Sequence, residues 1–125
     1  MSDIEFETLG RVALIRLNRP QTLNALTMPM LGEIRDGVRR AEADPEVTAI
    51  AFTGEGRGFC SGLDSAALVA STQAGSAGQR RAAADELPGM FSYLMEVSKP
   101  VIAAVNGVAA GGGFILAMMS DLRFG

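Results

Sequence analysis

Apolar and polar residues alternate near the start of the chain and predict a β-hairpin. The alternation runs over residues 4–8 and in part over Val12–Leu17, which is typical of strands with one exposed face. Residues 9–11 lie between the two runs and predict the turn. Arg19 and Pro20 then end the hairpin, because proline fixes φ and removes a backbone donor.

The next segment has the apolar spacing of an α-helix. Thr27 is a residue type favoured at N-caps, and apolar side chains then recur at three- or four-residue intervals as far as Ala43. These apolar positions are Leu31, Ile34, Val38 and Ala41. Residues 44–45, Asp-Pro, predict a turn, residues 47–53 predict a short apolar strand, and the glycine-rich residues 54–58 predict a loop.

The second half of the chain predicts further helices and strands in alternation. Residues 65–70 fit one or two helical turns, and residues 79–96 predict a long helix that Pro88 kinks or divides. Residues 101–105 predict a strand, and residues 111–119 predict a helix that is apolar nearly all round. The order β-β-α-β-α-β-α therefore predicts an α/β fold.

Composition narrows the class of protein. The chain has 125 residues, 48% of them hydrophobic, enough for one domain with a core. A net charge of -3 without a basic run argues against a nucleic-acid partner. The single cysteine excludes an intrachain disulfide, and the acidic start lacks the apolar core of a signal peptide. Gly, Asn or Pro interrupts the apolar stretches well short of a membrane span, so we expect a soluble cytoplasmic protein with no membrane partner.

Two glycine-containing patches carry the candidate chemistry. They are residues 57–64 and residues 109–114, and each follows an apolar strand-like run. Glycine leaves peptide N–H groups uncovered, and the second patch lies where a helix begins, at the positive end of its dipole. Two such patches together can hold a developing negative oxygen. Acyl chemistry in an oxyanion hole is therefore the leading hypothesis.

Four stretches of the sequence resemble the enoyl-CoA hydratase/isomerase family, also called the crotonase family. They are Asn-Arg-Pro (18–20) with Asn-Ala-Leu (24–26), Gly-Phe-Cys-Ser-Gly-Leu-Asp (58–64), Lys-Pro-Val-Ile-Ala-Ala-Val-Asn-Gly (99–107), and Gly-Gly-Gly (111–113) running into Ala-Met-Met-Ser-Asp (117–121). Each stretch is weak alone, but the four occur in the family's order. The resemblance implies the family's spiral of repeated β-β-α units, and homotrimers or hexamers.

The resemblance also implies that residues 1–125 form the N-terminal part of a single crotonase-like domain. Residues 121–125 begin what looks like another strand and stop, whereas the family's domain is longer. We therefore expect a truncated domain. The family's second catalytic carboxylate would lie beyond the matching end.

By resemblance, the backbone N–H groups of Ser61 and Gly112 form the oxyanion hole. The substrate is then a coenzyme A thioester, with no separate cofactor. The residues assigned to substrate binding are Gln21, Thr22, Leu23, Asn24, Ala25, Gly62, Leu63, Asp64 and Gly111. The sequence departs from the hydratase pattern at Ile115, where hydratases of the family carry a glutamate. Because isoleucine cannot hold or move a proton, double-bond isomerisation is favoured over hydration.

For several residues, the sequence allows both a functional and a structural role. Arg19 either meets a CoA phosphate or is a surface charge. Cys60 is either a nucleophile or a small buried residue, and Asp64 either a base or a residue that fixes its loop or caps a helix. Residues 71–78 are either a mobile surface loop or a loop that orders over bound acyl-CoA.

Other function classes fit the sequence less well. The absence of histidine excludes metal ligation by His and a Ser-His-Asp triad within this stretch, and we expect no metal. Residues 107–113 fit a Gly-x-x-x-Gly-x-Gly dinucleotide pattern, although this pattern comes late in the chain. Ile115 also raises the alternative of a non-catalytic acyl-CoA-binding protein with the same fold.

Overall fold

The computed structural model describes residues 3–64, 91–109, 116 and 122–124. Its main feature is a mixed five-stranded sheet in the order β1-β2-β3-β5-β7, beside a two-stranded sheet, β4-β6. The five strands are β1 (Ile4–Leu9), β2 (Val12–Leu17), β3 (Ala49–Gly54), β5 (Val101–Ala104) and β7 (Leu122–Phe124). The α/β class expected from the sequence is confirmed.

The predicted hairpin is present, with a tighter turn than expected. Strands β1 and β2 pair antiparallel, and Leu9 lies opposite Val12, so only Gly10 and Arg11 form the turn. Gly10 has φ +61°, a conformation that glycine adopts without steric cost. The expected three-residue turn was wrong by one residue because cross-strand pairing extends β1 to Leu9.

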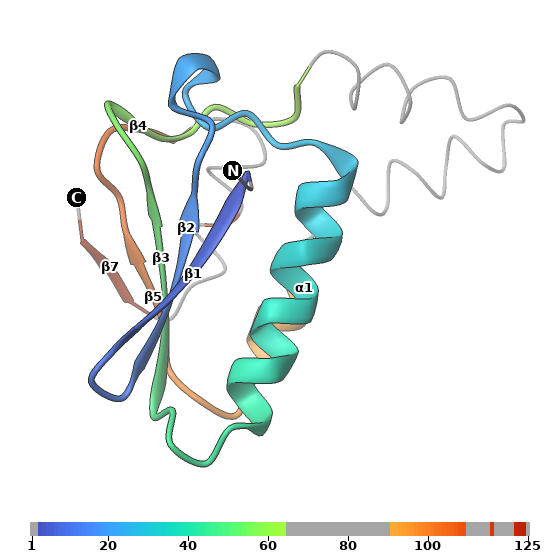
Figure 1. The fold of residues 1–125 in the computed structure, drawn as a ribbon, viewed down its shortest axis with the longest axis vertical. Coiled ribbons are helices and arrows are strands. Elements are labelled where there is room, and N and C mark those ends of the chain that lie inside the picture. The colour runs from blue at the N-terminus through green and yellow to red at the C-terminus, as the bar shows by residue number, and fades with distance from the viewer. Residues whose placement is uncertain (1–2, 65–90, 110–115, 117–121, 125) are drawn as a thin grey trace, which may run out of the picture.

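One helix, α1 (Met28–Ala43), connects β2 to the parallel strand β3 and lies along one face of the sheet (Figure 1). The N-cap prediction is confirmed, because the Thr27 hydroxyl accepts a hydrogen bond from the Met30 N–H at 3.3 Å. The helix buries its apolar stripe against sheet residues such as Ile15 and Phe52. The buried residues of the stripe are Met30, Ile34, Gly37, Val38 and Ala41.

Strand β3 begins two residues later than predicted. Residues before Ala49 belong to the turn that follows α1, where the Val47 N–H donates to the Asp44 carbonyl at 3.1 Å. Strands β3, β5 and β7 continue the parallel part of the sheet. The strand predicted over residues 101–105 is confirmed as β5. The strand-like sequence after Asp121 is confirmed as β7.

The segment before β5 differs from the predicted long α-helix. In the described part, Ser92–Glu96 forms the short 3-10 helix η2, in which the Leu94 N–H bonds to the Phe91 carbonyl at 3.0 Å. Phe91 and Leu94 are buried, while Met95 is 72% exposed. The rest of that prediction, residues 79–90, lies outside the described residues. The predictions for residues 65–70 and 71–78 lie there as well.

Lys99 attaches this segment to the end of α1. Its ammonium donates to the carbonyl oxygens of Ala41 at 2.8 Å and Asp44 at 2.6 Å, at the negative end of the helix dipole. Beside it, the Glu42 carboxylate accepts from the Ser98 N–H at 2.7 Å. The residues between η2 and β5 are therefore hydrogen-bonded to the last turn of α1.

Strands β4 (Gly58–Cys60) and β6 (Val108–Ala109) were not predicted. They pair in parallel, with Gly58 opposite Val108 and Cys60 opposite Ala109. Both are too short to show a period in the sequence. Of the helix predicted over residues 111–119, only Leu116 is described, as helical and buried. Within the described residues, no helix has the length and apolarity that a bilayer crossing needs.

Candidate functional site

The structure brings together two segments that the resemblance assigned to substrate binding. The first contains the 3-10 helix η1 (Pro20–Thr22) and continues to Leu26, and the second is the segment 61–64. The Leu26 N–H donates to the Gly62 carbonyl at 2.7 Å, and the Asp64 N–H donates to the Leu26 carbonyl at 2.8 Å. Two segments far apart in the sequence therefore lie side by side.

Ser61 adds a side-chain contact between the same two segments. Its hydroxyl donates to the Thr22 carbonyl at 3.0 Å. The Ser61 side chain is therefore engaged in holding the loops together. Any donation to a substrate oxygen would come from its backbone N–H, which is the role that the resemblance implies.

Asn24 is completely buried, and its side chain holds neighbouring backbone. Its Oδ1 accepts from the Arg19 N–H at 2.7 Å, and its Nδ2 donates to the carbonyls of Glu55 at 3.0 Å and Gly58 at 2.8 Å. Its φ of +58° lies in the left-handed region, which asparagine tolerates better than most residues. The Asn24 side chain is thus committed to internal contacts, and its backbone N–H also donates internally, to the Arg19 carbonyl at 2.9 Å.

Arg19 and Asp64 form a partly buried pair between the two segments. The Arg19 Nη1 lies 3.4 Å from Asp64 Oδ2 and donates to the Ala25 carbonyl at 2.9 Å. The side chains are 17% and 21% exposed, so Arg19 is not a free surface charge. The geometry supports the interpretation of Asp64 as a residue that fixes its loop.

Asn106 has a structural role that sequence reasoning missed. Its Oδ1 accepts from the Gly54 N–H at 3.1 Å, and its Nδ2 donates to the carbonyls of Gly56 at 2.9 Å and Gly58 at 3.2 Å. The available signal was an Asn-Gly pair directly after a predicted strand, a pattern typical of turns. That pattern alone does not indicate which distant loop the side chain holds.

The glycine after Asn106 allows close backbone packing. A Cβ atom built on Gly107 would overlap the carbonyl of Arg57. The corner between β5 and β6 therefore lies directly against the start of β4. Only a residue without a side chain fits there.

The parallel pairing of β4 and β6 bears on the two proposed oxyanion donors. Ser61 directly follows β4, and the glycine run that contains Gly111 and Gly112 begins two residues after β6. Parallel neighbours have their carboxyl ends at the same edge of a sheet. The glycine run and Ile115 lie outside the described residues.

Cys60 lies next to Ser61 and is fully buried. Burial raises the pKa of its thiol to about 11, although a hydrogen bond from the Gly62 backbone opposes the rise. The thiol is therefore protonated at neutral pH. This supports the interpretation of Cys60 as a small buried residue over that of a nucleophile.

We predict that Cys60 resists alkylation in the folded protein. At about pH 8, iodoacetamide should modify it roughly 100-fold more slowly than in urea-unfolded protein, because the folded thiol is rarely ionised. The raised pKa means that this group's contribution to stability is present below its ordinary value of 9.0 and is lost as the pH rises through about 11. Mass spectrometry measures the labelling, and equal rates in both states would contradict the prediction.

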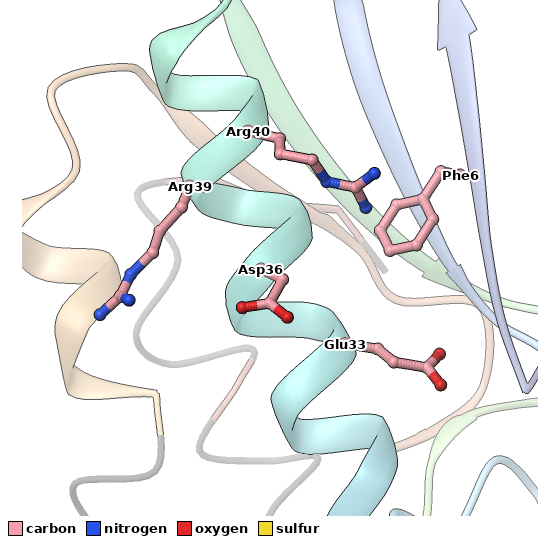
Figure 2. A pocket seen from close by; sticks show the side chains of 5 residues that line it. All are labelled: Phe6, Glu33, Asp36, Arg39 and Arg40. Carbon is pink, nitrogen blue, oxygen red and sulfur yellow. The ribbon is translucent and has the colours of Figure 1, made fainter.

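A groove along α1, on the flank where Phe6 of β1 faces the helix, is separate from this site (Figure 2). It is lined by Phe6 from β1 and by helix residues of both charges, Glu33, Asp36, Arg39 and Arg40. The Arg40 guanidinium lies over the Phe6 ring, 4.8 Å from its centroid. None of the residues assigned to substrate binding lines this groove.

Comparisons with known proteins agree with the resemblance. The family model described as enoyl-CoA hydratase/isomerase matches residues 7–124. The chain is 42% identical over 115 residues to a probable enoyl-CoA hydratase of Mycobacterium tuberculosis, covering 90% of this chain and 42% of that protein. It is 36% identical over 127 residues to a crotonyl-CoA hydratase of Syntrophomonas wolfei, covering 97% of this chain and 45% of that protein.

The fold is similar to solved structures of the same family. A crystal structure of an enoyl-CoA hydratase from Bacillus anthracis aligns with a TM-score of 0.81 at 27% identity, covering 98% of this chain and 46% of that chain. The chain spans less than half the length of these relatives and corresponds to an N-terminal portion of them. The chain therefore belongs to the enoyl-CoA hydratase/isomerase family and has the α/β crotonase fold over the part that it spans.

Proposed function

We propose that this chain carries the oxyanion hole of an acyl-CoA enzyme, with the backbone N–H groups of Ser61 and Gly112 as donors. The observation that carries the proposal is the parallel pairing of β4 with β6. The segments that follow these strands start from one edge of the small sheet. Two preorganised donors there would stabilise the negative charge that develops on a thioester oxygen when its enolate forms.

The neighbouring loops supply the proposed binding surface for coenzyme A. Residues 21–25 lie against the segment 61–64 through the hydrogen bonds of Leu26 and Ser61. We assign CoA contacts to these two segments and to Gly111, with a homotrimer or hexamer as the assembly of the full-length protein. Localisation in the cytoplasm stays a prediction, since curated relatives include mitochondrial proteins of Dictyostelium discoideum and Pongo abelii.

The reaction type depends on a proton carrier. Relatives named as hydratases favour the addition of water to an enoyl thioester. Ile115 favours isomerisation, in which one carboxylate elsewhere in the protein moves a proton between carbons of the enolate. The two reactions share the stabilised enolate. Ile115 also leaves the non-catalytic acyl-CoA-binding protein as the alternative.

Replacing Gly112 with proline tests the proposal directly. Proline removes the proposed N–H donor, so turnover of an enoyl-CoA by the full-length protein should fall about 10²–10³-fold. A conjugated aryl-enoyl-CoA should show a long-wavelength absorption shift on binding to the unmutated protein, and that shift should be reduced in the variant.

Binding of coenzyme A without an acyl group is the control, because it does not use the hole. Calorimetry should give the same dissociation constant for both proteins. Absence of the absorption shift in the unmutated protein, despite CoA binding, would contradict the proposed oxyanion hole. Carbonyl polarisation without turnover would favour the non-catalytic alternative.

A further inference from the structure

Two side-chain amides converge on one backbone oxygen at the start of β4. The carbonyl oxygen of Gly58 accepts from Asn24 Nδ2 at 2.8 Å and from Asn106 Nδ2 at 3.2 Å. Asn24 comes from the loop after β2, and Asn106 comes from the corner after β5. Segments from both halves of the described chain therefore fix the same peptide group.

The same two amides also hold the rest of the loop between β3 and β4. Asn24 bonds to the Glu55 carbonyl, and Asn106 bonds to the Gly54 N–H and the Gly56 carbonyl. The backbone of this loop is thus held by side chains from outside it. Side-chain amides suit this task because each offers both donors and an acceptor.

A short, buried connection joins this clamped loop to Ser61. Strand β4 contains only Gly58, Phe59 and Cys60, and all three residues are buried. Densely packed side chains transmit displacement instead of absorbing it. A shift of Gly58 would therefore move the Ser61 backbone as well.

Asn106 also lies at the corner between β5 and β6. It precedes Gly107 and β6, and the glycine run follows β6. The hydrogen bonds of its side chain to Gly54, Gly56 and Gly58 hold the corner between β5 and β6 against the loop that precedes Ser61. One side chain therefore joins the corner between β5 and β6 to the loop that precedes Ser61.

We infer that Asn24 and Asn106 are positioning residues that fix the backbone N–H of Ser61 in place by clamping the Gly58 carbonyl. The inference rests on the oxyanion hole proposed above. These residues act through the backbone and need no contact with substrate. A misplacement of about 1 Å in a catalytic group can cost about 10²-fold in rate.

Replacing Asn106 with aspartate is the sharpest test. Asn106→Asp keeps the side chain's size and its acceptor for the Gly54 N–H, but removes both donated bonds and places a negative charge near the Gly58 carbonyl. The residue is exposed, so the new carboxylate stays hydrated. In the full-length protein, we expect kcat to fall about 10–100-fold while KM stays within about 3-fold. The absorption shift of a bound aryl-enoyl-CoA should shrink in parallel.

Thr53→Val is the matched control. It removes a side-chain hydrogen bond to a main-chain carbonyl, from Thr53 Oγ1 to Ala104 at 3.1 Å, between β3 and β5. That bond does not reach the Gly58 carbonyl. We expect Thr53→Val to lower the unfolding midpoint but to leave kcat and the absorption shift unchanged.

The outcomes separate this inference from the function on which it rests. If the unmutated protein polarises the thioester and Asn106→Asp retains its kcat and full absorption shift, the positioning role is overturned and the oxyanion hole stands. Equal losses of kcat in Asn106→Asp and Thr53→Val also overturn it, because a general structural effect would then explain both. If the unmutated protein gives no shift, the hole itself is overturned. Should Asn106→Asp fail to fold, Asn106→Ser removes the same amide donors without adding charge and is judged by the same measurements.

Discussion

The full-length protein is expected to hydrate a short trans-2-enoyl-CoA about 10²–10⁴-fold more slowly than a family hydratase that carries glutamate at the position of Ile115. Water needs a positioned acceptor for its proton, and an isoleucine side chain provides none. The proposed oxyanion hole uses backbone N–H groups and would not depend on this side chain. Enolate stabilisation should therefore persist while hydration fails, and Δ3-to-Δ2 isomerisation of a 3-enoyl-CoA, measured in parallel, should exceed hydration.

Ile115→Glu is the matching gain-of-function variant. It should raise hydration only if another carboxylate of the full-length protein already faces the substrate. Apolar surroundings would raise the pKa of the new glutamate and limit the gain at neutral pH. Hydration by the unmutated protein at an ordinary enzyme rate, roughly 1–10³ per second, would show that Ile115 does not disable the reaction.

Gly107→Ala should lower the free energy of unfolding by about 3 kcal/mol or more. A Cβ atom there would overlap the Arg57 carbonyl and would also lie 3.1 Å from the Gly58 Cα. Both neighbours are backbone, so relief requires the β5–β6 corner to move away from the start of β4. Urea unfolding of the full-length protein at fixed concentration measures the change.

Gly32→Ala serves as the control, because it should raise the free energy of unfolding instead of lowering it. Gly32 is exposed within α1, and a Cβ atom there would have no neighbour within 4 Å. Alanine should stabilise the helix by about 0.5–1 kcal/mol, because glycine loses more backbone freedom on folding. If the two variants had similar unfolding midpoints, the tight contact at Gly107 would not limit the fold.

The elements predicted correctly are those whose signal is local. The hairpin and α1 show periods that can be read within a few residues, and Thr27 marks the helix start by its side chain alone. Strands β4 and β6 were missed because their existence depends on pairing between residues about fifty positions apart. The 3-10 geometry of Ser92–Glu96 likewise has no distinct sequence period.

In the candidate site too, local motifs could be predicted from the sequence, whereas contacts between distant residues could not. The resemblance pointed to Ser61 and to the loop that contains Asn24, and the structure places these segments side by side. The resemblance gave no indication that the Asn24 side chain makes only internal hydrogen bonds. It also gave no indication that Asn106 donates to the same acceptor, the Gly58 carbonyl. Such contacts join three separate loops, and a single sequence contains no signal for that pairing. The roles of Gly112 and Ile115 still rest on the resemblance.

The order of strands in the large sheet has a consequence for synthesis on the ribosome. The spatial order β1-β2-β3-β5-β7 is also the order in which these strands leave the ribosome. Each new strand can join the most recently formed edge, and none has to insert between strands that have already paired. The nascent chain can therefore form the hairpin, α1 and β3 while later strands are still being translated. The Lys99 contacts to the end of α1 come only at a later stage, since the two segments are more than fifty residues apart.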